Sequence, residues 1–311
     1  MLFAKLDPKP SRSPRLVWLL RPDNPGANGL SSEPGKPSLL KALPTFLTAA
    51  SGIGAAALAY GHFVEANRLV AEQRTLTIPR WPSSLAGYRI GFIADLHIRD
   101  QQTITLARAA LAWLAEQNPD VLVIGGDLVD RNTPYYRHLL QFALQDLPYF
   151  AGKCLVIPGN RDHDRGDVNQ VKTIIEDLGA RFLLNQVHQQ DGIEWAGIDS
   201  ANGGTPAPCT TLEKSNPQNP IVVLWHEPDM VEQLPFGPEL MLAGHSHGGQ
   251  FLAPWGWAPK KTSNGRKYIR GFYPNAPAPL YVTRGLATTF FPSRLFCPPE
   301  VAVLTLLPPS T

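Results

Sequence analysis

The sequence contains little cysteine, and its cysteines lie far apart. More than fifty residues separate Cys154 from Cys209 and Cys209 from Cys297, and none belongs to a C-x-x-C pair. Disulfide-stabilised domains and thiolate zinc sites both need closely or regularly spaced cysteines. We therefore expect neither, and interpret the three cysteines as ordinary packing residues.

The sequence also lacks a strong net charge. The formal charge of the 311 residues is +2, and 43% of them are apolar, which is enough for a full core. Residues 1–41 contain seven basic and three acidic side chains, whereas residues 80–311 contain nineteen basic and twenty-one acidic ones. Because the larger part is slightly acidic, we do not expect nucleic acid as its partner.

The first 38 residues lack a sustained apolar period. They are rich in proline, serine and glycine, and they contain more basic than acidic side chains. Segments of this composition cannot bury enough apolar surface to fold. We expect residues 1–38 to form a disordered basic tail.

A run of twenty uncharged residues, 42–61, follows this tail and is rich in alanine and glycine. Its length is that of a helix that spans a bilayer. The alternatives are a signal peptide cleaved near Ala57-Leu-Ala59 and a buried helix of the main domain. No twin-arginine pair precedes it. We interpret residues 39–62 as a membrane anchor or signal segment. Basic residues before an anchor would place the main domain on the extracytoplasmic side, with the cytoplasmic face as the other option.

Residues 63–86 are interpreted as a linker and residues 87–311 as the main domain. In its first half, apolar runs typical of strands alternate with amphipathic stretches typical of helices. The expected strands are 88–95, 120–127, 153–160, 193–199, 221–226, 239–245, 268–273, 279–285 and 301–307. The expected helices are 103–117, 134–147 and 167–179. This mixture predicts an α/β (α+β) fold of layered sheets flanked by helices.

Polar side chains that can bind a metal follow five of these strands. They are Asp95, His97, Asp127, Asn160, His226, His245 and His247. Taken singly, such an aspartate is usually a helix cap and such a histidine a hydrogen-bonded structural residue. Seven donors at the ends of five apolar strands together indicate a site, because α/β folds build their sites at the carboxyl ends of strands.

The spacing within these motifs suggests how the donors are shared. Residues 95 and 97 are i and i+2, which point to the same side of an extended chain and can reach one ion. Two glycines before Asp127 let the backbone come close to a ligand. His245 and His247, in L-A-G-H-S-H-G-G-Q, can each direct an imidazole to one of two neighbouring metals. Carboxylate and imidazole donors favour two divalent ions, with Mn, Fe or Zn first and Mg or Co as further candidates.

The order D-x-H, G-D-x-x-D, G-N-x-D, H and G-H-x-H over residues 95–247 resembles the calcineurin-like metallophosphoesterase family. The G-H-S-H-G-G-Q motif, the stretch Y-V-T-R-G-L-A-T-T-F-F and the hydrophobic N-terminal segment are similar to its membrane-associated bacterial branch. The resemblance implies a four-layer αββα sandwich with an N-terminal hydrophobic helix. It also implies one ion held by Asp95, His97 and His247, another held by Asn160, His226 and His245, and Asp127 bridging them.

Two metals about 3.5–4 Å apart suit phosphoester hydrolysis, because they can convert a bridging water into hydroxide and neutralise charge on the phosphoryl oxygens. We therefore expect a metal-dependent phosphoesterase, and more narrowly a phosphodiesterase acting on a small or lipid-linked substrate. A catalytically silent binding module on the same fold is a rival hypothesis. The presence of all seven ligand positions argues against it.

One position departs from the family pattern. Most members read G-N-H-D or G-N-H-E, and that histidine is implied to contact phosphate or protonate the leaving group; this chain has Arg161. Arginine cannot act as a general acid at neutral pH, but it can clamp a phosphate with two hydrogen bonds. The G-N-R-D form resembles the UDP-2,3-diacylglucosamine pyrophosphatases of lipid A biosynthesis, which is the alternative function. Against it, an outward-facing domain would meet no UDP-sugar.

Residues near this motif complete the predicted catalytic set, which is Arg161, Asp127, Asp162 and His163. Asp162 and His163 either support the ligands from behind or simply face solvent. Asp130 is expected to orient a ligand or to cap the following helix.

Residues 250–273 interleave basic side chains with aromatic ones. The stretch contains five lysines and arginines, two tryptophans and no carboxylate. This composition suits a membrane interface or an anionic lipid headgroup, while a solvated loop over core aromatics is the alternative.

Overall fold

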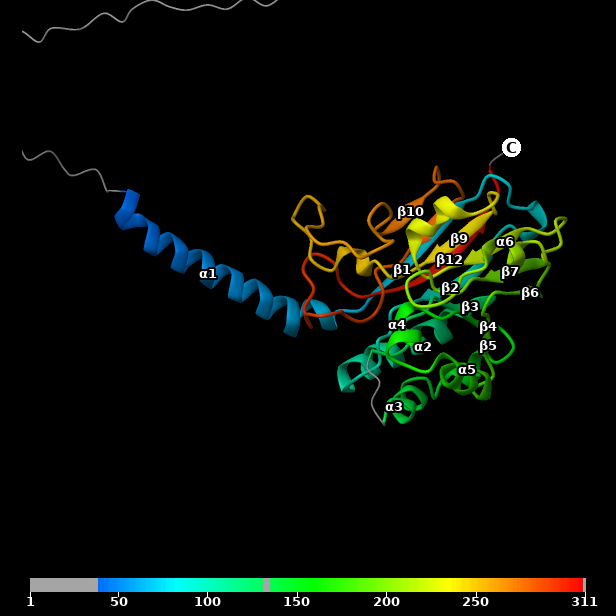
Figure 1. Cartoon of the computed structure of the whole chain (residues 1–311), viewed down its shortest axis with the longest axis horizontal. Coiled ribbons are helices and arrows are strands. Elements are labelled where there is room, and N and C mark those ends of the chain that lie inside the picture. Colours follow the sequence, from blue (N-terminus) through cyan, green and yellow to red (C-terminus); the bar gives the residue numbers. More distant parts are fainter. Residues whose placement is uncertain (1–38, 131–134, 310–311) are drawn as a thin grey trace, which may run out of the picture. The chain divides into compact units, whose positions relative to one another are not determined.

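The computed structural model describes residues 39–130 and 135–309, and two six-stranded sheets form the centre of its main domain (Figure 1). The strands of the first sheet are β1 (Val70–Thr77), β2 (Tyr88–Ile93), β3 (Val121–Ile124), β4 (Cys154–Val156), β5 (Arg181–Phe182) and β12 (Glu300–Leu307). Those of the second are β6 (Gln186–Gln190), β7 (Ile193–Gly197), β8 (Ile221–Leu224), β9 (Leu240–Ala243), β10 (Gly271–Tyr273) and β11 (Leu280–Val282).

Each sheet has a parallel centre. The first has the order β1-β12-β2-β3-β4-β5, with β2 to β5 parallel and β12 antiparallel to β2. The second has the order β10-β11-β9-β8-β7-β6, with β11, β9, β8 and β7 parallel. The central strands are continuous apolar runs because both of their faces are buried.

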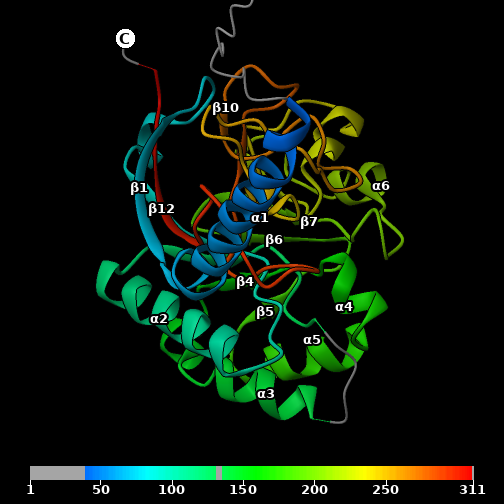
Figure 2. The ribbon, with the colours of Figure 1, turned by 90° about the vertical axis from the view of Figure 1, so that its left-hand side faces the viewer.

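The helices are α1 (Leu39–Phe63), α2 (Gln101–Gln117), α3 (Tyr136–Ala143), α4 (Asn160–Asp164), α5 (Val168–Asp177) and α6 (Pro208–Leu212). Helices α2, α3 and α5 pack on the outer face of the first sheet (Figure 2). The outer face of the second sheet is covered by α6, a 3-10 turn at Pro228–Gln233 and loops. The expected two-sheet fold is confirmed, but the helical layer over the second sheet consists only of short segments.

Local sequence explains the boundaries of α2. Asp100 precedes the helix and accepts a hydrogen bond from the backbone N–H of Thr103, which satisfies one of the free amides of the first turn. Asn118 ends it in the left-handed conformation, with φ 46°. The helix therefore begins two residues before the start expected from its apolar period.

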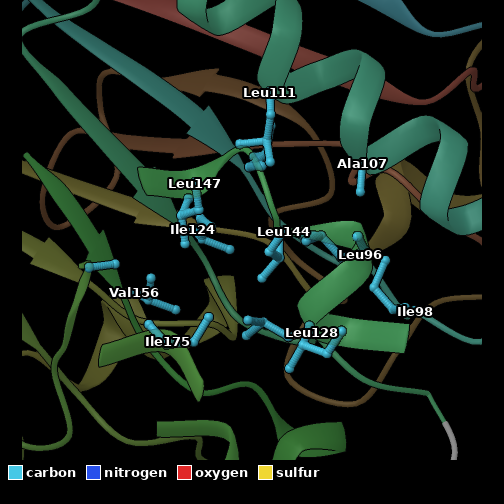
Figure 3. Close-up of a cluster of buried hydrophobic side chains, with 14 of the residues drawn as sticks. Leu96, Ile98, Ala107, Leu111, Ile124, Leu128, Leu144, Leu147, Val156 and Ile175 are labelled. Carbon is cyan, nitrogen blue, oxygen red and sulfur yellow. The ribbon is translucent and has the colours of Figure 1, made fainter. Parts of the chain in front are cut away.

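A cluster of apolar side chains fills the space between the first sheet and its helices (Figure 3). Leu96, Ile98 and Leu128 belong to this cluster although they follow the ends of β2 and β3. These residues alternate with the predicted ligands in the sequence, so core packing anchors the loops that carry the ligands. A second cluster lies between the two sheets.

Residues 63–86 contain a strand as well as a connection. β1 pairs in parallel with β12 over eight residues, from Val70 with Glu300 to Thr77 with Leu307. The interpretation of this stretch as a linker is therefore wrong for residues 70–77, because the pairing partner lies about 230 residues further along the chain. Local sequence carries no direct sign of such a partner.

The N-terminal segment is helical where it is described, and the expected tail, residues 1–38, lies outside the described residues. Helix α1 covers the uncharged run. Within residues 39–130 and 135–309, no helix combines the length and apolar character needed to cross a membrane. Cys154 and Cys297 are buried, as expected of packing residues, whereas Cys209 is exposed.

Candidate metal centre and active site

The predicted ligands meet at one edge of the two sheets, because each follows the carboxyl end of a strand. Asp95 and His97 follow β2, Asp127 follows β3, Asn160 follows β4 and begins α4, His226 follows β8, and His245 and His247 follow β9. Backbone hydrogen bonds continue beyond the strands: the amide of Asp95 donates to Gly126 O (2.9 Å) and that of His97 to Asp127 O (2.9 Å). The loops are thus held in register with each other.

Six of the seven side chains form two buried groups that could each hold a metal ion. One group contains Asp95, His97 and His247, and the other contains Asp127, His226 and His245. Within each group the candidate ligand atoms all lie within 4.8 Å of one another. His245 and His247 belong to different groups, which is the division their spacing predicts.

Asp127 lies between the two groups. Its Oδ2 is 3.5 Å from His97 Nε2 in one group and 3.3 Å from His226 Nε2 in the other. In the first group, His247 Nε2 is 3.2 Å from His97 Nε2 and 3.4 Å from Asp95 Oδ1. Atoms about 2.1 Å from one tetrahedral ion lie about 3.4 Å from each other, so these separations fit ligands that share ions.

Hydrogen bonds orient the imidazoles toward the centre. The Nδ1 of His226 lies 2.7 Å from Gly125 O, and the Nδ1 of His247 lies 3.0 Å from Ala287 O. With these nitrogens as donors, each Nε2 keeps its lone pair and faces the carboxylates. His245 is held the other way, with Nε2 2.7 Å from Ser263 O, so its Nδ1 is the free ligand atom. Such outer hydrogen bonds are typical of metal-binding histidines.

Asn160 adds a further donor at this point. Its Oδ1 is buried and has no hydrogen-bond partner within residues 39–130 and 135–309. An unsatisfied buried carbonyl oxygen is costly unless a ligand or ion completes it. The donor set of buried carboxylates, imidazoles and this amide oxygen therefore fits divalent cations.

The backbone at the ligands has an unusual conformation. Asp95 (φ 56°), His97 (φ 41°), Asp127 (φ 56°), His245 (φ 65°) and His247 (φ 50°) all adopt the left-handed region. Few residues other than glycine do so, and such strain persists where the surrounding structure over-determines it, often at functional sites. Asp95 and His97 reach the same group for this reason, and not because the chain is extended as the i, i+2 spacing suggested.

Burial controls the protonation of most of the histidines. It lowers the pKa of His97 to about 4 and holds the pKa of His247 well below its ordinary value. It also lowers the pKa of His245. Neutral imidazole is the form that binds metals, so these three side chains are kept ready as ligands.

The buried carboxylates favour the binding of positive charge at the centre. Burial raises the pKa of Asp95 to about 7, with His226 opposing and Asp127 adding to the rise. Burial also disfavours the charged form of Asp127, but the neighbouring histidines outweigh it and hold its pKa well below the usual range. For His226, burial lowers the pKa, yet Asp127 and Asp95 outweigh it and raise the pKa well above 6.5. Two buried carboxylates so close together need a positive partner.

Close backbone approach at Gly126 and Gly159 brings the loops of the centre together. Gly126 has φ 91°, and a Cβ there would lie 2.6 Å from Gly159 N and 2.8 Å from His226 Nδ1. A Cβ on Gly159 would lie 2.3 Å from Asp127 Oδ1. The expectation that the glycines before Asp127 admit a ligand is thus corrected for Gly126, which admits the neighbouring loop and His226.

Asp162 holds two of these loops together. Its Oδ1 accepts hydrogen bonds from the amides of Leu128 (2.9 Å) and Val129 (3.2 Å), and its Oδ2 accepts one from Gly159 (2.8 Å). It is fully buried and does not line the pocket described below. These contacts are those of a positioning residue, and its predicted catalytic role stays a prediction.

Arg161 and four of the predicted ligands line a pocket of about 540 Å³. The backbone N–H of Arg161 donates to Asp127 Oδ1 (2.7 Å), and its side chain lines the pocket. The pocket is lined by Asp127, Asn160, Arg161, Asn202, His245, Ser246, His247, Gly249, Gln250, Phe251, Lys260, Lys261, Thr262, Ser263, Thr289, Phe290 and Phe291. Three of these side chains are basic, and three are phenylalanines.

His163 and Asp130 contact different residues beside the centre. The Nε2 of His163 lies 2.6 Å from Asp199 Oδ1, and this hydrogen bond raises the pKa of His163. His163 does not line the pocket, so the structure places this predicted catalytic residue beside the centre. Asp130 Oδ1 is 3.5 Å from His97 Nδ1, so of the two roles expected for Asp130 the contact fits that of orienting a ligand.

Sequence reasoning missed Asn202 and the residue that positions it. Asn202 Nδ2 lies 3.1 Å from His245 Nε2 and lines the pocket. The fully buried Glu227 accepts hydrogen bonds from the amides of Ala201 (2.9 Å) and Asn202 (3.2 Å). The available signal was the position of Asn202 just after an expected strand, and of Glu227 next to His226.

These observations define a hydrolase with two buried metal-capable groups at the strand ends of a two-sheet fold. Residues 88–249, more than half of the chain, match the family model for calcineurin-like phosphoesterases. The chain belongs to the calcineurin-like phosphoesterase family, whose members are dimetal-dependent hydrolases of phosphoester bonds.

Relatives extend the match over most of the chain. It is 29% identical to the uncharacterized metallophosphoesterase YkuE of Bacillus subtilis, over 84% of this chain and 91% of that protein. It is 28% identical to the phosphodiesterase YaeI of Escherichia coli, over 86% of this chain and 97% of that protein. It is 23% identical to the UDP-2,3-diacylglucosamine pyrophosphatase LpxG of Chlamydia muridarum, over 80% of this chain and 92% of that protein.

Proposed function

We propose that this protein is a phosphodiesterase that acts on small or lipid-linked phosphoesters, with divalent cations at the two buried groups. One observation carries the proposal: four of the predicted ligands, Asp127, Asn160, His245 and His247, form the floor of a pocket whose remaining lining includes Arg161, Lys260 and Lys261. A phosphate diester carries the negative charge that such a lining attracts. The likeness to the phosphodiesterase YaeI supports the same substrate class.

Cations bound by these residues would polarise the phosphoryl group and lower the pKa of a water molecule. Asp95, His97 and His247 would hold one cation. His226, His245 and Asn160 would hold the other, and Asp127 would contact both. Donor chemistry favours Mn, Fe or Zn, and reconstitution of metal-free protein with each ion tests that preference.

Arg161 acts on the phosphoryl oxygens. The guanidinium can donate two hydrogen bonds to them, and its backbone amide holds Asp127 in place at the same time. Because arginine keeps its proton at neutral pH, Arg161 stabilises charge and does not protonate the leaving group. The enzyme should therefore favour substrates with good leaving groups, such as aryl esters or a nucleotide phosphate.

The pyrophosphatase reaction on UDP-2,3-diacylglucosamine is the second candidate. Two observations favour it: the G-N-R-D form of residues 159–162 and the likeness to LpxG over most of both chains. In that reaction a nucleotide phosphate would leave, which suits a site without a dedicated proton donor. An extracytoplasmic location, which the basic residues before α1 favour, would keep the protein from UDP-sugars.

An assay with Mn added distinguishes these candidates. Purified protein is offered bis-p-nitrophenyl phosphate, p-nitrophenyl phosphate and UDP-2,3-diacylglucosamine at equal concentrations. A phosphodiesterase should turn over the diester fastest, whereas the pyrophosphatase should strongly prefer the UDP-sugar. A catalytically silent binding module would hydrolyse none of the three with any of the candidate metals.

A further inference from the structure

Exposed apolar side chains gather in a few segments of the chain, and two of them, Phe290 and Phe291, line the pocket. Among the described residues, fourteen large hydrophobic side chains are exposed, and ten of them belong to three segments of the chain. Five lie in residues 53–64, and five lie in the loops that follow β9 and β11, with Trp255 79% and Phe290 83% exposed. Exposed apolar groups that cluster in this way mark interaction surfaces more often than scattered ones do.

The two loops form a single surface because they are bonded to each other. The side-chain amide of Gln250 donates to the carbonyls of Thr289 (3.0 Å), Phe291 (2.9 Å) and Ser293 (3.1 Å). The amide of Leu252 donates to Leu295 O (2.9 Å). These hydrogen bonds therefore hold together the two loops that carry the exposed aromatic side chains.

The second loop also contacts the last turns of α1. The amide of Arg294 donates to Gly61 O (3.1 Å), and Ser293 Oγ donates to Leu58 O (3.2 Å). The exposed apolar residues near the end of α1 are thus bonded through the backbone to the same loop that borders the pocket.

Phe290 is presented outward at a cost in backbone strain. Its φ is 56°, a left-handed conformation that is unfavourable for a residue with a Cβ. The ring gains little burial in return, since it is 83% exposed. Strained residues of this kind cluster at binding and switch regions, so the outlier favours a contact made by the ring itself.

Basic groups surround these rings. Lys260 Nζ lies 4.5 Å from the centre of the Phe290 ring, and Arg161 Cζ lies 5.8 Å from it. The stretch 250–273 holds five basic residues and no carboxylate, whereas the whole of residues 80–311 is slightly acidic. Arg161, Lys260 and Lys261 therefore place positive charge at the pocket, whereas Lys267 of the same stretch is paired with Glu232.

We infer that this rim surface, formed by Trp255, Trp257, Lys260, Lys261, Phe290 and Phe291, docks on an anionic lipid bilayer and that the pocket receives a lipid phosphoester from it. Tryptophan is the side chain most typical of the membrane interface, and lysines there bind anionic headgroups. The charge of the rim matches such a surface, while a protein partner would need complementary carboxylates. The substrate part of the inference rests on the proposed phosphodiesterase function.

The first measurement locates the tryptophans. Full-length protein is mixed with phosphatidylglycerol vesicles that contain brominated phosphatidylcholine, which quenches only indoles that enter the bilayer. We expect quenching in the wild type and its loss in the Trp255→Phe/Trp257→Phe variant. The other five tryptophans are present in both proteins, so the difference in quenching reports on Trp255 and Trp257 and not on binding through α1. Equal quenching in both proteins would overturn the inference.

The second measurement compares two esters with the same leaving group. Hexadecyl p-nitrophenyl phosphate is embedded in phosphatidylglycerol vesicles, and bis-p-nitrophenyl phosphate is dissolved in water. Trp255→Ser/Trp257→Ser should lower the ratio of the embedded to the soluble rate at least ~10-fold, because two interfacial side chains are lost. Neither tryptophan lines the pocket, so an unchanged soluble rate shows that the variant is folded.

Phe236→Ser is the matched control, since Phe236 is 46% exposed but lies outside the rim surface. Its ratio should equal that of the wild type. An unchanged ratio in the tryptophan variant would overturn the inference. A wild-type dimer that forms with rising concentration and is absent in this variant would also overturn it, because the surface would then bind a second copy of the chain. Quenching without turnover of either ester would instead disprove the phosphodiesterase function and leave the docking surface supported.

Discussion

The floor of the pocket consists of buried donors held by backbone hydrogen bonds, whereas its rim consists of exposed aromatic and basic side chains on two loops. Both contain non-glycine residues in the left-handed conformation, including Asp127 on the floor and Phe290 on the rim. On the floor, the left-handed residues direct donor atoms toward a common point. On the rim, the left-handed conformation of Phe290 directs its ring toward solvent.

This difference between floor and rim indicates that the floor carries out the chemistry and that the rim controls which substrates reach it. The floor carries the groups that would hold cations and contact the phosphoryl group, so changes there should abolish turnover of every substrate. The rim carries no predicted ligand, so changes there should alter which substrates arrive. The comparison would fail if a change on the floor altered only the choice of substrate, or if a change on the rim abolished turnover of every substrate.

The largest effect is expected from Asp127→Ala, because Asp127 Oδ2 faces both groups of the floor. The variant should lose at least one ion per chain and nearly all activity, while thermal unfolding stays cooperative. Elemental analysis and turnover of bis-p-nitrophenyl phosphate measure this. Asp177→Ala, an exposed aspartate on α5, should retain both ions. Two ions and normal turnover in Asp127→Ala would show that Asp127 does not bridge.

The two histidines of the G-H-S-H motif allow the floor to be divided. His245 and His247 belong to different groups, so each single alanine variant should keep one ion and the double variant none. Elemental analysis after dialysis counts the ions. If the double variant retained as much metal as either single variant, both histidines would serve the same ion.

Arg161 lies where floor and rim meet, because its amide holds Asp127 and its side chain lies over Phe290. Arg161→Ala should lower kcat/KM by roughly 10–1000-fold without removing metal, the scale of one lost charge-stabilising contact. Arg161→His should narrow the gap between poor and good leaving groups and add an ionisation near pH ~6.5.

The neighbouring Arg165→Ala is the control for Arg161, since Arg165 directly follows α4, is exposed and does not line the pocket. Its kcat/KM should equal that of the wild type. An unchanged kcat/KM for Arg161→Ala on every phosphoester would reduce Arg161 to a surface residue beside a ligand.

The smallest effect concerns the His163–Asp199 pair, which supports the floor from outside the pocket. The hydrogen bond to Asp199 raises the pKa of His163 above 6.5. Burial raises the pKa of Asp199, but the hydrogen bonds from His163 and from the Thr205 amide outweigh it and lower the pKa. The stability from His163 is therefore full below pH ~6.5 and is lost as the pH rises through its raised pKa, while that from Asp199 is lost as the pH falls below ~4.

His163→Gln should accordingly lower the free energy of unfolding by on the order of 1 kcal/mol near pH ~5.5, and by less above pH ~8. Urea unfolding at both pH values measures this. His138→Gln, an exposed histidine on α3, should show no such pH-dependent difference. A deficit that grows with pH would contradict the assignment of the pair.

Much of the fold follows from local patterns. The strands around residues 122, 155, 222 and 241 are continuous apolar runs, the strand around residue 90 is largely apolar, and α2 begins at an aspartate cap. These features depend on side chains close in sequence, so they could be predicted. β1 could not, because its residues alternate weakly and its stability comes from pairing with β12 at the other end of the chain.

The sequence by itself determined which donors are available and that they follow apolar strands, since ligand chemistry belongs to the side chain and strand ends are locally encoded. Only the tertiary structure decided how the donors divide into two groups, which loops carry left-handed residues, and that the loop of Phe290 is bonded to the loop that carries Trp255. Asp95 and His245 are 150 residues apart, yet the His245 amide donates to Asp95 Oδ2 (3.0 Å). Contacts of that range depend on the packing free energy of both sheets together, and no local stretch contains that information.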